Sequence, residues 1–522
     1  MIQYVSLSSE RTEILSDNAN RKHEFNARNL CGPHRKEREG LIQTTKLWIG
    51  GKWVEGSRTE PLHAPYGGER LAEIGYASEE QAAQAVIAAR DAFRDFRAEP
   101  AHRRSSILYQ AADLLERRSA EAAEIAALEA GKPIKAARAE IARTVQTYLF
   151  AAEAARNLRG ETIPMDAAPR GEGRRAMLGR EPVGVVSAIT PFNFPFNLVA
   201  HKVGPAIAAG NAIVLKPAEQ TPLSALLLAE LFEEAGLPDG VLNIIPGSGK
   251  ELGETLSSHP DIAFVTFTGS PEVGRQIRAQ AGLRKVTLEL GSNSPLLVDR
   301  GFSTEELVRI ADEAAAGAFA YNGQVCISVQ RVLVHEEHVE EFTELLAERA
   351  RKLTAGDPLD ERTDITPLIN RRAADRLKSW LERAKEGGAR VRCGGSFDGS
   401  LMMPAVLTDV PENAELSCEE AFGPVAVVAP FGSWEEAIAA ANRSKFGLQA
   451  GVFTKNMEHA LQAADRLHCG GVMINDVPTF RLDHMPYGGV KDSGSGREGV
   501  RYAMEEMTEP KLVSFRSGFF EN

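Results

Sequence analysis

Short runs rich in β-branched residues alternate with runs of helical spacing between residues 183 and 290. The apolar runs predict strands at residues 184–189, 212–215, 241–245, 263–267 and 286–290. The amphipathic runs between them predict helices at residues 199–209, 224–235, 250–258 and 271–281. A strand that recurs about every 25 residues, with a helix in between, is typical of βαβ units. The pattern therefore predicts a doubly wound parallel sheet with helices on both faces.

Helical spacing dominates the chain before this region, and a looser α/β alternation follows it. Capping boxes at 78–81 and 303–306 each predict a helix start, because paired side chains there satisfy free backbone N–H groups. The Ala-rich stretch 107–158 predicts two or more long amphipathic helices. After residue 296 we expect strands at 332–334, 425–429, 451–454, 472–474 and 511–515, and helices at 303–321, 339–353 and 371–386. Two α/β lobes joined by smaller elements fit the 522-residue length.

Composition then excludes several classes of protein. The chain has 60 Lys and Arg against 72 Asp and Glu, a formal net charge of −12, which argues against nucleic acid or anionic lipid as partner. A hydrophobic content of 43% is ample for a core. The uncharged stretch 182–200 contains three prolines and two asparagines, so it does not predict a membrane span.

The N-terminus and the cysteines bear on the compartment. Residues 1–44 mix charges of both signs, so we expect a disordered N-terminal tail without a secretory signal. The five cysteines lie far apart and form no CxxC pair. That usage is typical of reduced thiols, so we expect a cytoplasmic protein.

Three glycine-containing segments are candidates for phosphate binding. Gly494, Gly496 and Gly499 match G-x-G-x-x-G, but they follow a turn-rich stretch instead of a strand, so we interpret them as a loop-to-helix turn. Residues 246–253 and 267–270 each follow a predicted strand and open a predicted helix, where free N–H groups favour an anion. Neither has the spacing of a dinucleotide fingerprint, so a tight turn is an equal alternative.

Three polar side chains occur at points where α/β proteins carry chemistry. Cys326 follows a predicted helix near a glycine, and a thiolate there can attack a carbonyl group. Glu289 closes a predicted strand, where a carboxylate can act as general base. Asn193 lies between two prolines that fix the backbone, and its amide can donate to an oxyanion. Taken singly, a core thiol, a salt-bridge carboxylate and a turn-bracing amide are the simpler interpretations.

No metal site is predicted. His335 and His338 have i,i+3 spacing but do not form HExxH, and their charged surroundings are typical of a solvated helix start. No other group of potential ligands has the spacing of a metal site.

Six motifs follow one another along the chain: Pro-Phe-Asn-Phe-Pro (191–195), Leu-Lys-Pro-Ala-Glu-Gln-Thr-Pro (215–222), Phe-Thr-Gly-Ser (267–270), Leu-Glu-Leu-Gly (288–291), Gly-Gln-Val-Cys (323–326) and Glu-Ala-Phe-Gly-Pro (420–424). In this order they resemble the motif series of the NAD(P)-dependent aldehyde dehydrogenase superfamily. The resemblance runs from about Leu47 to Phe515. It implies an α/β fold with two Rossmann-like doubly wound parallel-sheet domains and a small bridging, oligomerisation element.

The resemblance also implies domain boundaries. The NAD-binding domain would comprise residues 45–162 and 183–290, and the catalytic domain residues 291–499. The oligomerisation element would comprise residues 163–182 and 500–522. Members of the superfamily are dimers or tetramers, so a homodimer or homotetramer is expected by analogy.

Catalytic roles follow from the same resemblance. Cys326 would attack the aldehyde as a thiolate, and the Asn193 amide with the Cys326 backbone N–H would hold the oxyanion. Hydride loss to the nicotinamide would leave a thioester, and Glu289 would activate the water that hydrolyses it. Lys202 and Glu498 match the suspected proton relay of the superfamily.

The resemblance further implies a cofactor site. Lys216 and Glu219 would face the adenosine ribose, and because a carboxylate accepts from a 2′-OH and repels a 2′-phosphate, Glu219 predicts NAD over NADP. Glu420 would hold the nicotinamide ribose, and Phe422 would flank the ring. The other residues expected along the cofactor are Thr190, Pro191, Phe192, Gly249, Gly253, Phe267, Gly269, Ser270 and Leu290.

The resemblance indicates the substrate less clearly than it indicates the catalytic and cofactor residues. Residues 475–489 are similar to the branch that holds lactaldehyde, phosphonoacetaldehyde and non-phosphorylating glyceraldehyde-3-phosphate dehydrogenases. Arg481 and His484 in this stretch are the candidate substrate-binding residues and could meet an anion, with surface or salt-bridge residues as an equal alternative. Val325 is apolar where relatives with phosphate- or phosphonate-bearing substrates often have Arg, which favours a small neutral or hydroxylated aldehyde. An anionic aldehyde with a phosphonate, sulfonate or phosphate group is the alternative.

Rival functions on the same residues are acyl transfer to CoA and non-catalytic binding. Relatives that acylate CoA usually lack the general-base Glu, so Glu289 favours hydrolysis. The joint presence of Cys326, Glu289 and Asn193 argues against a binding protein without activity. A phosphate-transferring nucleotide enzyme would need a P-loop and metal-binding carboxylates, which the sequence does not contain.

Overall fold

The computed structural model of the protein describes residues 43–517. Of the predicted tail, residues 1–42 lie outside this range, and only Gln43 and Thr44 are described. Both pair with β4 (Arg70–Tyr76): the Gln43 carbonyl accepts from the Glu73 N–H, and Thr44 forms a bridge with Glu73. These two residues therefore belong to the folded domain and not to a tail.

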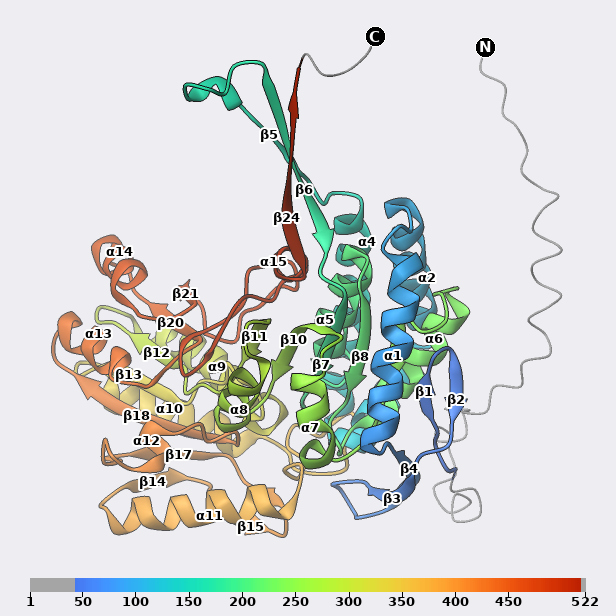
Figure 1. Ribbon diagram of the computed structural model, residues 1–522. Coiled ribbons are helices and arrows are strands. Elements are labelled where there is room, and N and C mark those ends of the chain that lie inside the picture. The colour runs from blue at the N-terminus through green and yellow to red at the C-terminus, as the bar shows by residue number, and fades with distance from the viewer. Residues whose placement is uncertain (1–42, 518–522) are drawn as a thin grey trace, which may run out of the picture.

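The first lobe is built around an eight-stranded sheet with the order β2-β1-β9-β8-β7-β10-β11-β23 (Figure 1). Its five central strands run parallel and coincide with the five predicted ones: β7 (Val185–Ile189), β8 (Ala212–Lys216), β9 (Leu242–Ile244), β10 (Ile262–Thr268) and β11 (Lys285–Glu289). The edge strands β1 (Leu47–Ile49), β2 (Lys52–Val54) and β23 (Gly494–Ser495) are antiparallel. The predicted doubly wound parallel sheet is thus confirmed, with antiparallel edges added.

Helices cover this sheet on both sides. The four predicted crossover helices are α5 (Asn197–Ala209), α6 (Pro222–Glu234), α7 (Gly249–Ser258) and α8 (Pro271–Ala281). The predicted capping box starts α1 (Glu79–Phe96), because Ser78 Oγ accepts from the Gln81 N–H and the Gln81 side chain accepts from the Ser78 N–H. The Ala-rich region forms three helices: α2 (Ala101–Arg117), α3 (Ser119–Ala130) and α4 (Ile134–Ala155).

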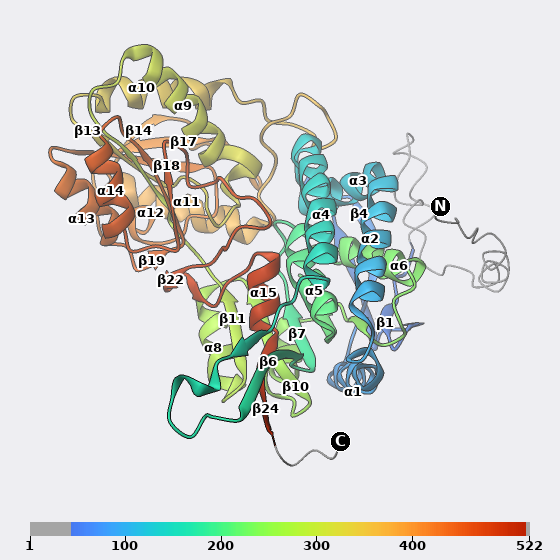
Figure 2. The same cartoon turned by 90° about the horizontal axis from the view of Figure 1, so that it is seen from above.

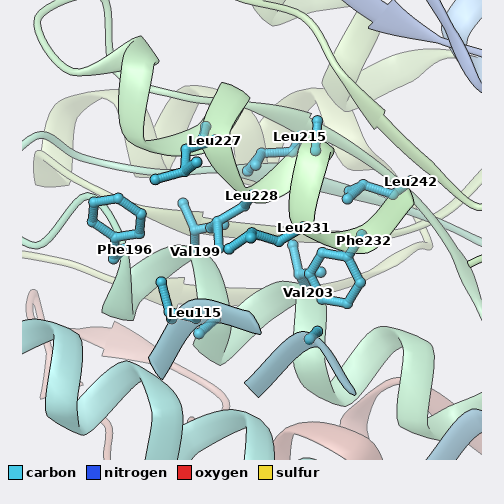
Figure 3. Close-up of a cluster of buried hydrophobic side chains, with 14 of the residues drawn as sticks. Leu115, Phe196, Val199, Val203, Leu215, Leu227, Leu228, Leu231, Phe232 and Leu242 are labelled. Atoms are coloured by element: carbon cyan, nitrogen blue, oxygen red, sulfur yellow. The ribbon is translucent and has the colours of Figure 1, made fainter. Parts of the chain in front are cut away.

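An apolar cluster fastens α2, α5 and α6 to the sheet (Figure 3). Its fully buried members include Leu115, Phe196, Val199, Val203, Leu215, Leu227, Leu228, Leu231, Phe232 and Leu242. Burial of one such side chain contributes about 1.5–3 kcal/mol. The cluster therefore holds α5, the helix that carries Lys202, firmly against the ends of the strands.

The second lobe contains a seven-stranded sheet with the order β14-β17-β18-β13-β12-β20-β21. All neighbours are parallel except the edge strand β14. The strands are β12 (Pro295–Val298), β13 (Arg331–His335), β14 (Arg390–Cys393), β17 (Ala405–Thr408), β18 (Val425–Phe431), β20 (Gln449–Phe453) and β21 (Gly471–Ile474). The helices are α9 (Thr304–Phe319), α10 (Val339–Lys352), α11 (Arg371–Glu386), α13 (Trp434–Asn442) and α14 (Met457–Arg466). The predicted capping box at Ser303 starts α9, which ends before Tyr321 because that residue has φ of 46°.

A three-stranded antiparallel sheet projects from the two lobes (Figure 1, Figure 2). β24 (Thr508–Arg516) pairs along its whole length with β6 (Arg174–Pro182), and β5 (Glu161–Ile163) pairs with the other side of β6. α15 (Val500–Glu506) leads into β24 and packs on α5. β6 and β24 lie in the segments expected to form the oligomerisation element, of which residues 518–522 lie outside the described range, whereas two of the three residues of β5 lie in the range expected for the NAD-binding domain. No helix within residues 43–517 is long and apolar enough to cross a membrane.

Candidate active site

Most of the residues expected to bind the cofactor gather, together with Glu289, at one edge of the first sheet. Residues 190–192 follow β7, Lys216 ends β8, residues 267–270 end or follow β10, and Glu289 ends β11. Because these parallel strands are neighbours, their carboxyl ends meet, and open α/β sheets bind their ligands at that edge. The second lobe contributes Cys326, which follows the short 3-10 turn η5 (Ala320–Gly323).

Asn193 connects the first lobe to the segment that carries the thiol. Its buried side chain donates from Nδ2 to the Gln324 carbonyl at 3.0 Å. Gln324 lies two residues before Cys326, after a turn in which Tyr321 and Asn322 have φ of 46° and 56°. Left-handed backbone at such residues costs energy and persists only where surrounding contacts enforce it. The Asn193 amide is therefore held beside the turn that presents the thiol.

A buried ion pair braces the Asn193 loop, and sequence reasoning missed it. Lys132 Nζ bonds to the Glu140 carboxylate, and both side chains are fully buried. Glu140 Oε1 also accepts two backbone N–H groups at the start of α5, at 2.9 and 3.1 Å. The Lys132 ammonium lies 3.9 Å from the centre of the Phe194 ring and 4.6 Å from that of Tyr321. Breaking a buried ion pair would leave an uncompensated charge, so the Lys132–Glu140 pair stays formed. The contacts of Lys132 with Phe194 and Tyr321 then connect the Asn193 loop to the turn that precedes Cys326.

Cys326 is partly exposed, and its thiol has one hydrogen-bonding partner among the described residues. Its Sγ lies 2.8 Å from the Tyr487 hydroxyl oxygen. The Arg481 guanidinium carbon lies 3.6 Å from the centre of the Tyr487 ring. Burial raises the pKa of the Cys326 thiol to about 11, while the Tyr487 hydrogen bond and the charge of Arg481 act in the opposite direction.

Glu289 is a buried carboxyl group with unused lone pairs. The residue is 3% exposed, and neither carboxyl oxygen has a hydrogen-bond partner among the described residues. A Cβ at Gly488 would lie 2.7 Å from Glu289 Oε1, so a glycine leaves room for the carboxyl group. Burial, and then the negative charge of Glu498, raise the pKa of Glu289 well above its usual value. A carboxyl group shifted in this way is suited to act as general base.

Lys202 and Glu498, expected as a proton relay, are brought together. Lys202 Nζ donates to Glu498 Oε1 and to Thr266 Oγ1, both at 3.0 Å. The other carboxylate oxygen of Glu498 accepts from Arg481 at 3.1 Å. Burial opposes the charged form, but Lys202 and Arg481 lower the pKa of Glu498 to about 2. A fixed negative charge therefore lies beside Glu289.

The residues at the start of α7 form a cradle that fits a dinucleotide. The Gly249 N–H donates to the Glu219 carboxylate at 3.0 Å. A Cβ on Gly249 would lie 3.9 Å from Lys216 Cε and 4.0 Å from Glu219 Oε1, so Gly249 lies next to both side chains. Burial lowers the pKa of Lys216 to about 8 against the effect of Glu219. The N-termini of α7 and α8 lie at this edge with the positive ends of their helix dipoles, an arrangement that favours a pyrophosphate, and NAD(P) fits this site.

Glu420 and Phe422 approach from the second lobe. Glu420 Oε1 accepts from the Ser292 N–H at 2.9 Å, and a Cβ on Gly291 would lie 2.8 Å from Glu420 Oε2. Burial raises the pKa of Glu420 to about 7. The Phe422 ring meets the Phe192 ring edge-on, with centres 5.8 Å apart. Residues of both lobes thus frame the space expected for the nicotinamide half.

The remaining residues expected along the cofactor pack against glycines or cap a helix at the same edge of the sheet. The Phe267 ring lies under Gly269, where a Cβ would come within 2.5 Å of the ring. Ser270 caps α8 by accepting a backbone N–H at its Oγ, and Leu290 packs against α8 at the position of a glycine. A Cβ at Gly253 would meet open space. Gly253 thus tolerates a larger residue better than Gly249 does.

The two residues expected to bind substrate occupy different surroundings. Arg481 is buried between Tyr487 and Glu498, next to the thiol. His484 is exposed, and its ring centre lies 4.9 Å from that of Phe150. His484 lines a cavity of about 630 Å³ together with the ends of α4, β6 and α15. The contacts of His484 therefore lie with α4 and not with the thiol.

A polar network next to Arg481 was missed by sequence reasoning. Asp483 accepts from Arg143 of α4 at 2.7 and 3.1 Å, from Asn197 at 3.0 Å, and lies 3.0 Å from His201 Nε2. His201 Nδ1 and Arg481 Nε are buried and have no hydrogen-bond partner within the described part of the chain. Arg143 lies 340 residues before Asp483, so no local pattern connects them.

The glycine motif at residues 494–499 and the histidine pair His335 and His338 have structural roles. Gly494 pairs with Glu289 across β23 and β11, and Gly499, with φ of 92°, precedes α15, so this glycine motif is a loop-to-helix turn. His335 and His338 each accept a backbone N–H through a ring nitrogen. Over residues 43–517, no group of three His, Cys, Asp or Glu residues is placed to hold a metal ion.

Comparison with known proteins identifies the family of this constellation. The model of the aldehyde dehydrogenase family matches residues 53–513. The chain is 44% identical over 467 residues to 3-sulfolactaldehyde dehydrogenase of Priestia aryabhattai, covering 90% of this chain and 97% of that one. It is 40% identical over 471 residues to lactaldehyde dehydrogenase of Methanococcus maripaludis, covering 90% and 99%.

Solved structures agree with this assignment. An NAD-dependent aldehyde dehydrogenase from Sinorhizobium meliloti superposes with a TM-score of 0.89 at 36% identity, covering 94% of this chain and 99% of that one. An NADP-dependent glyceraldehyde-3-phosphate dehydrogenase from Bacillus halodurans, complexed with NADP, gives a TM-score of 0.88 at 35% identity, covering 91% and 99%. The chain therefore belongs to the aldehyde dehydrogenase family and is an oxidoreductase that oxidises an aldehyde with NAD(P).

Proposed function

We propose that this enzyme oxidises its aldehyde through a covalent bond to Cys326. The observation that carries the proposal is the convergence of three groups from separate segments: the Cys326 thiol, the Asn193 amide held at the Gln324 carbonyl, and the unpartnered Glu289 carboxyl group. Cys326→Ser is expected to bind NAD and to form no NADH with any aldehyde. NADH formation by this variant at the wild-type rate would refute the proposal.

In the first half-reaction, the Cys326 thiolate attacks the carbonyl carbon and an S–C bond forms. The carbonyl electron pair moves to oxygen, and the Asn193 Nδ2 and the Cys326 backbone N–H donate to that oxyanion. The chemistry that NAD supplies when bound is acceptance of the hydride from this carbon. On the chain, the product of this half-reaction is a thioester at Cys326.

In the second half-reaction, Glu289 takes a proton from a water molecule whose oxygen attacks the thioester carbon. The S–C bond breaks, the electron pair returns to sulfur, and the carboxylic acid leaves. The charged Glu498 makes Glu289 a stronger base, and the Lys202–Glu498 pair is the proposed relay for its proton. Acid formation that is unchanged by CoA supports hydrolysis, and an acyl-CoA product would refute it.

For the cofactor, the proposal is NAD in preference to NADP. The Glu219 carboxylate lies beside Lys216 and Gly249, and a 2′-phosphate there would meet a negative charge. Glu219→Gln is expected to raise kcat/KM with NADP relative to NAD. Equal kcat/KM values for both nucleotides in the unaltered enzyme would contradict this proposal.

For the substrate, we propose a small neutral aldehyde, hydroxylated near the carbonyl group. The cations next to the thiol are already balanced, since Arg481 and Lys202 face Glu498 and the thiolate, and Asp483 holds Arg143. The unpartnered His201 Nδ1 and Arg481 Nε are polar atoms that a substrate hydroxyl can bind. The M. maripaludis relative, named for lactaldehyde, supports this choice.

An anionic aldehyde is the second candidate, and the P. aryabhattai relative, named for 3-sulfolactaldehyde, favours it. A sulfonate would have to displace Asp483 from Arg143, whose side chain is 34% exposed. The test compares kcat/KM for lactaldehyde and 3-sulfolactaldehyde in the unaltered enzyme and in Arg143→Met. A preference for the sulfonate that Arg143→Met abolishes would replace the neutral-substrate proposal.

For the assembly, we propose a homodimer or homotetramer formed through the projecting sheet. Within the described residues β24 is an edge strand of this sheet, and Met177, Leu512, Val513 and Phe515 on the sheet are 39–53% exposed. Exposed apolar residues on an open edge are typical of an interface. Light scattering should give a multiple of the monomer mass, and Leu512→Lys with Phe515→Lys should lower it. A monomeric unaltered protein would refute the proposal.

A further inference from the structure

We propose that Tyr487 is a catalytic residue whose phenol O–H donates a hydrogen bond to Cys326 Sγ and stabilises the attacking thiolate, with Arg481 strengthening this donor from above the phenol ring. The inference rests on the proposed role of Cys326 as nucleophile.

The contact between the two residues is direct. The hydroxyl oxygen of Tyr487 lies 2.8 Å from Cys326 Sγ, and Tyr487 is 3% exposed. The backbone of Tyr487 is fixed as well, because its N–H and carbonyl both bond to Glu498. Ile327 and Leu448 pack around the ring in the same apolar cluster. The phenol therefore has little freedom to leave the sulfur.

The charge arrangement explains the direction of the effect. Arg481 lies over the Tyr487 ring at 3.6 Å and is held there by Glu498 at 3.1 Å. A cation at the ring face favours negative charge on the phenol oxygen, so the O–H becomes a better donor. A donor to sulfur stabilises the thiolate and not the thiol. The Tyr487 bond and Arg481 both lower the pKa of Cys326, against burial and the carboxyl groups of Glu420 and Glu289.

This role differs from that of the oxyanion donors. Asn193 donates to the Gln324 carbonyl, and its proposed partner in the reaction is the substrate oxygen, whereas the phenol contacts the sulfur itself. When the S–C bond forms, the sulfur loses its charge and the Tyr487 bond weakens. Hydrolysis of the thioester regenerates the thiolate, and the bond returns. Tyr487 thus assists both the attack of the sulfur on the aldehyde and the release of the sulfur from the thioester.

Two opposing effects of the thiol pKa, on the thiolate fraction and on the nucleophilicity of the thiolate, determine how much Tyr487→Phe changes the alkylation rate. A shift of one pKa unit changes the thiolate fraction tenfold below the pKa. The intrinsic nucleophilicity of a thiolate changes by only about 0.4–0.5 log unit per pKa unit in the opposite direction. If Tyr487→Phe raises the thiol pKa by about one unit, alkylation near pH 7.5 should slow about threefold. Above the thiol pKa the variant should react as fast as the unaltered enzyme or faster.

The experiment measures the rate of iodoacetamide alkylation at Cys326 against pH, with the modified peptide quantified by mass spectrometry. Tyr487→Phe should shift the profile upward by about one pH unit, and Arg481→Met should shift it in the same direction. Tyr109→Phe is the matched control, since this exposed tyrosine also has an arginine over its ring, Arg156 at 6.0 Å. It should leave the profile unchanged.

Two outcomes would overturn the inference, and they are distinguishable. An unchanged or lowered profile in Tyr487→Phe refutes the role of Tyr487 and leaves the covalent mechanism standing. Wild-type turnover by Cys326→Ser refutes the covalent mechanism and with it the role of Tyr487. Thermal unfolding of each variant is recorded alongside, and Arg481→Met tests the same direction of shift without altering the phenol.

Discussion

Replacement of Glu289 by Gln removes the proposed base and keeps the shape of the side chain. Neither carboxyl oxygen has a partner among the described residues, so no hydrogen bond is broken, and repulsion by Glu498 is relieved. We therefore expect unchanged or slightly higher thermal stability. A general base contributes about 10²–10⁴-fold, which corresponds to about 3–5 kcal/mol of transition-state free energy. Because Glu289 acts only on the thioester, the whole loss should fall on the second half-reaction.

Stopped-flow absorbance of NADH separates the two half-reactions. Glu289→Gln should release close to one NADH per active site in a fast phase, followed by turnover slowed about 10²–10⁴-fold. The unaltered enzyme should lose hydrolysis rate as the pH falls through the raised pKa of Glu289, because only the carboxylate form accepts the proton of water. The variant should lack that dependence. Glu386→Gln, an exposed position at the end of α11, is the control.

Two results would refute this reasoning about Glu289. Hydrolysis at the wild-type rate in Glu289→Gln would show that another group activates the water. Loss of the fast phase itself would show that Glu289 is required before the hydride leaves.

Two further predictions concern the frame of the site. Gly291→Ala should raise KM for NAD about tenfold or more with little change in kcat, because its Cβ would lie 2.8 Å from Glu420 Oε2, whereas Gly179→Ala, which faces open space on β6, should leave KM unchanged. Equal KM values in both variants would contradict the role of Glu420. Lys132→Met should lower the free energy of unfolding in urea by about 3–5 kcal/mol and reduce kcat, since Glu140 would be left as a buried charge without its partner. An unchanged urea midpoint would contradict that account.

The elements of the first lobe could be read from the sequence because their signals are local. The alternation of apolar and amphipathic runs located all five central strands, and the capping boxes at Ser78 and Ser303 mark the starts of α1 and α9. The antiparallel edges were not predicted. β23 pairs Gly494 with Glu289, and nothing within a few residues of either one encodes that contact.

The residues of the candidate site also fall into two groups: those that a local motif reveals and those that only the fold brings together. Cys326, Glu289 and Asn193 were identified through motifs, each a short run of consecutive residues. Tyr487 lies 161 residues from Cys326, and its hydrogen bond forms only when the folded chain brings these two segments together. The Lys132–Glu140 pair shows the same limit, because Lys and Glu side chains are usually solvent-exposed and their burial here depends on packing.

The most direct test of the covalent mechanism is to trap its intermediate. Glu289→Gln is mixed with NAD and aldehyde, quenched in acid after the fast phase, and mapped by peptide mass spectrometry. We expect an acyl group on the peptide that contains Cys326, in an amount equal to the NADH released. NADH release with no acyl group on that peptide, or with the acyl group on another residue, would contradict the covalent mechanism.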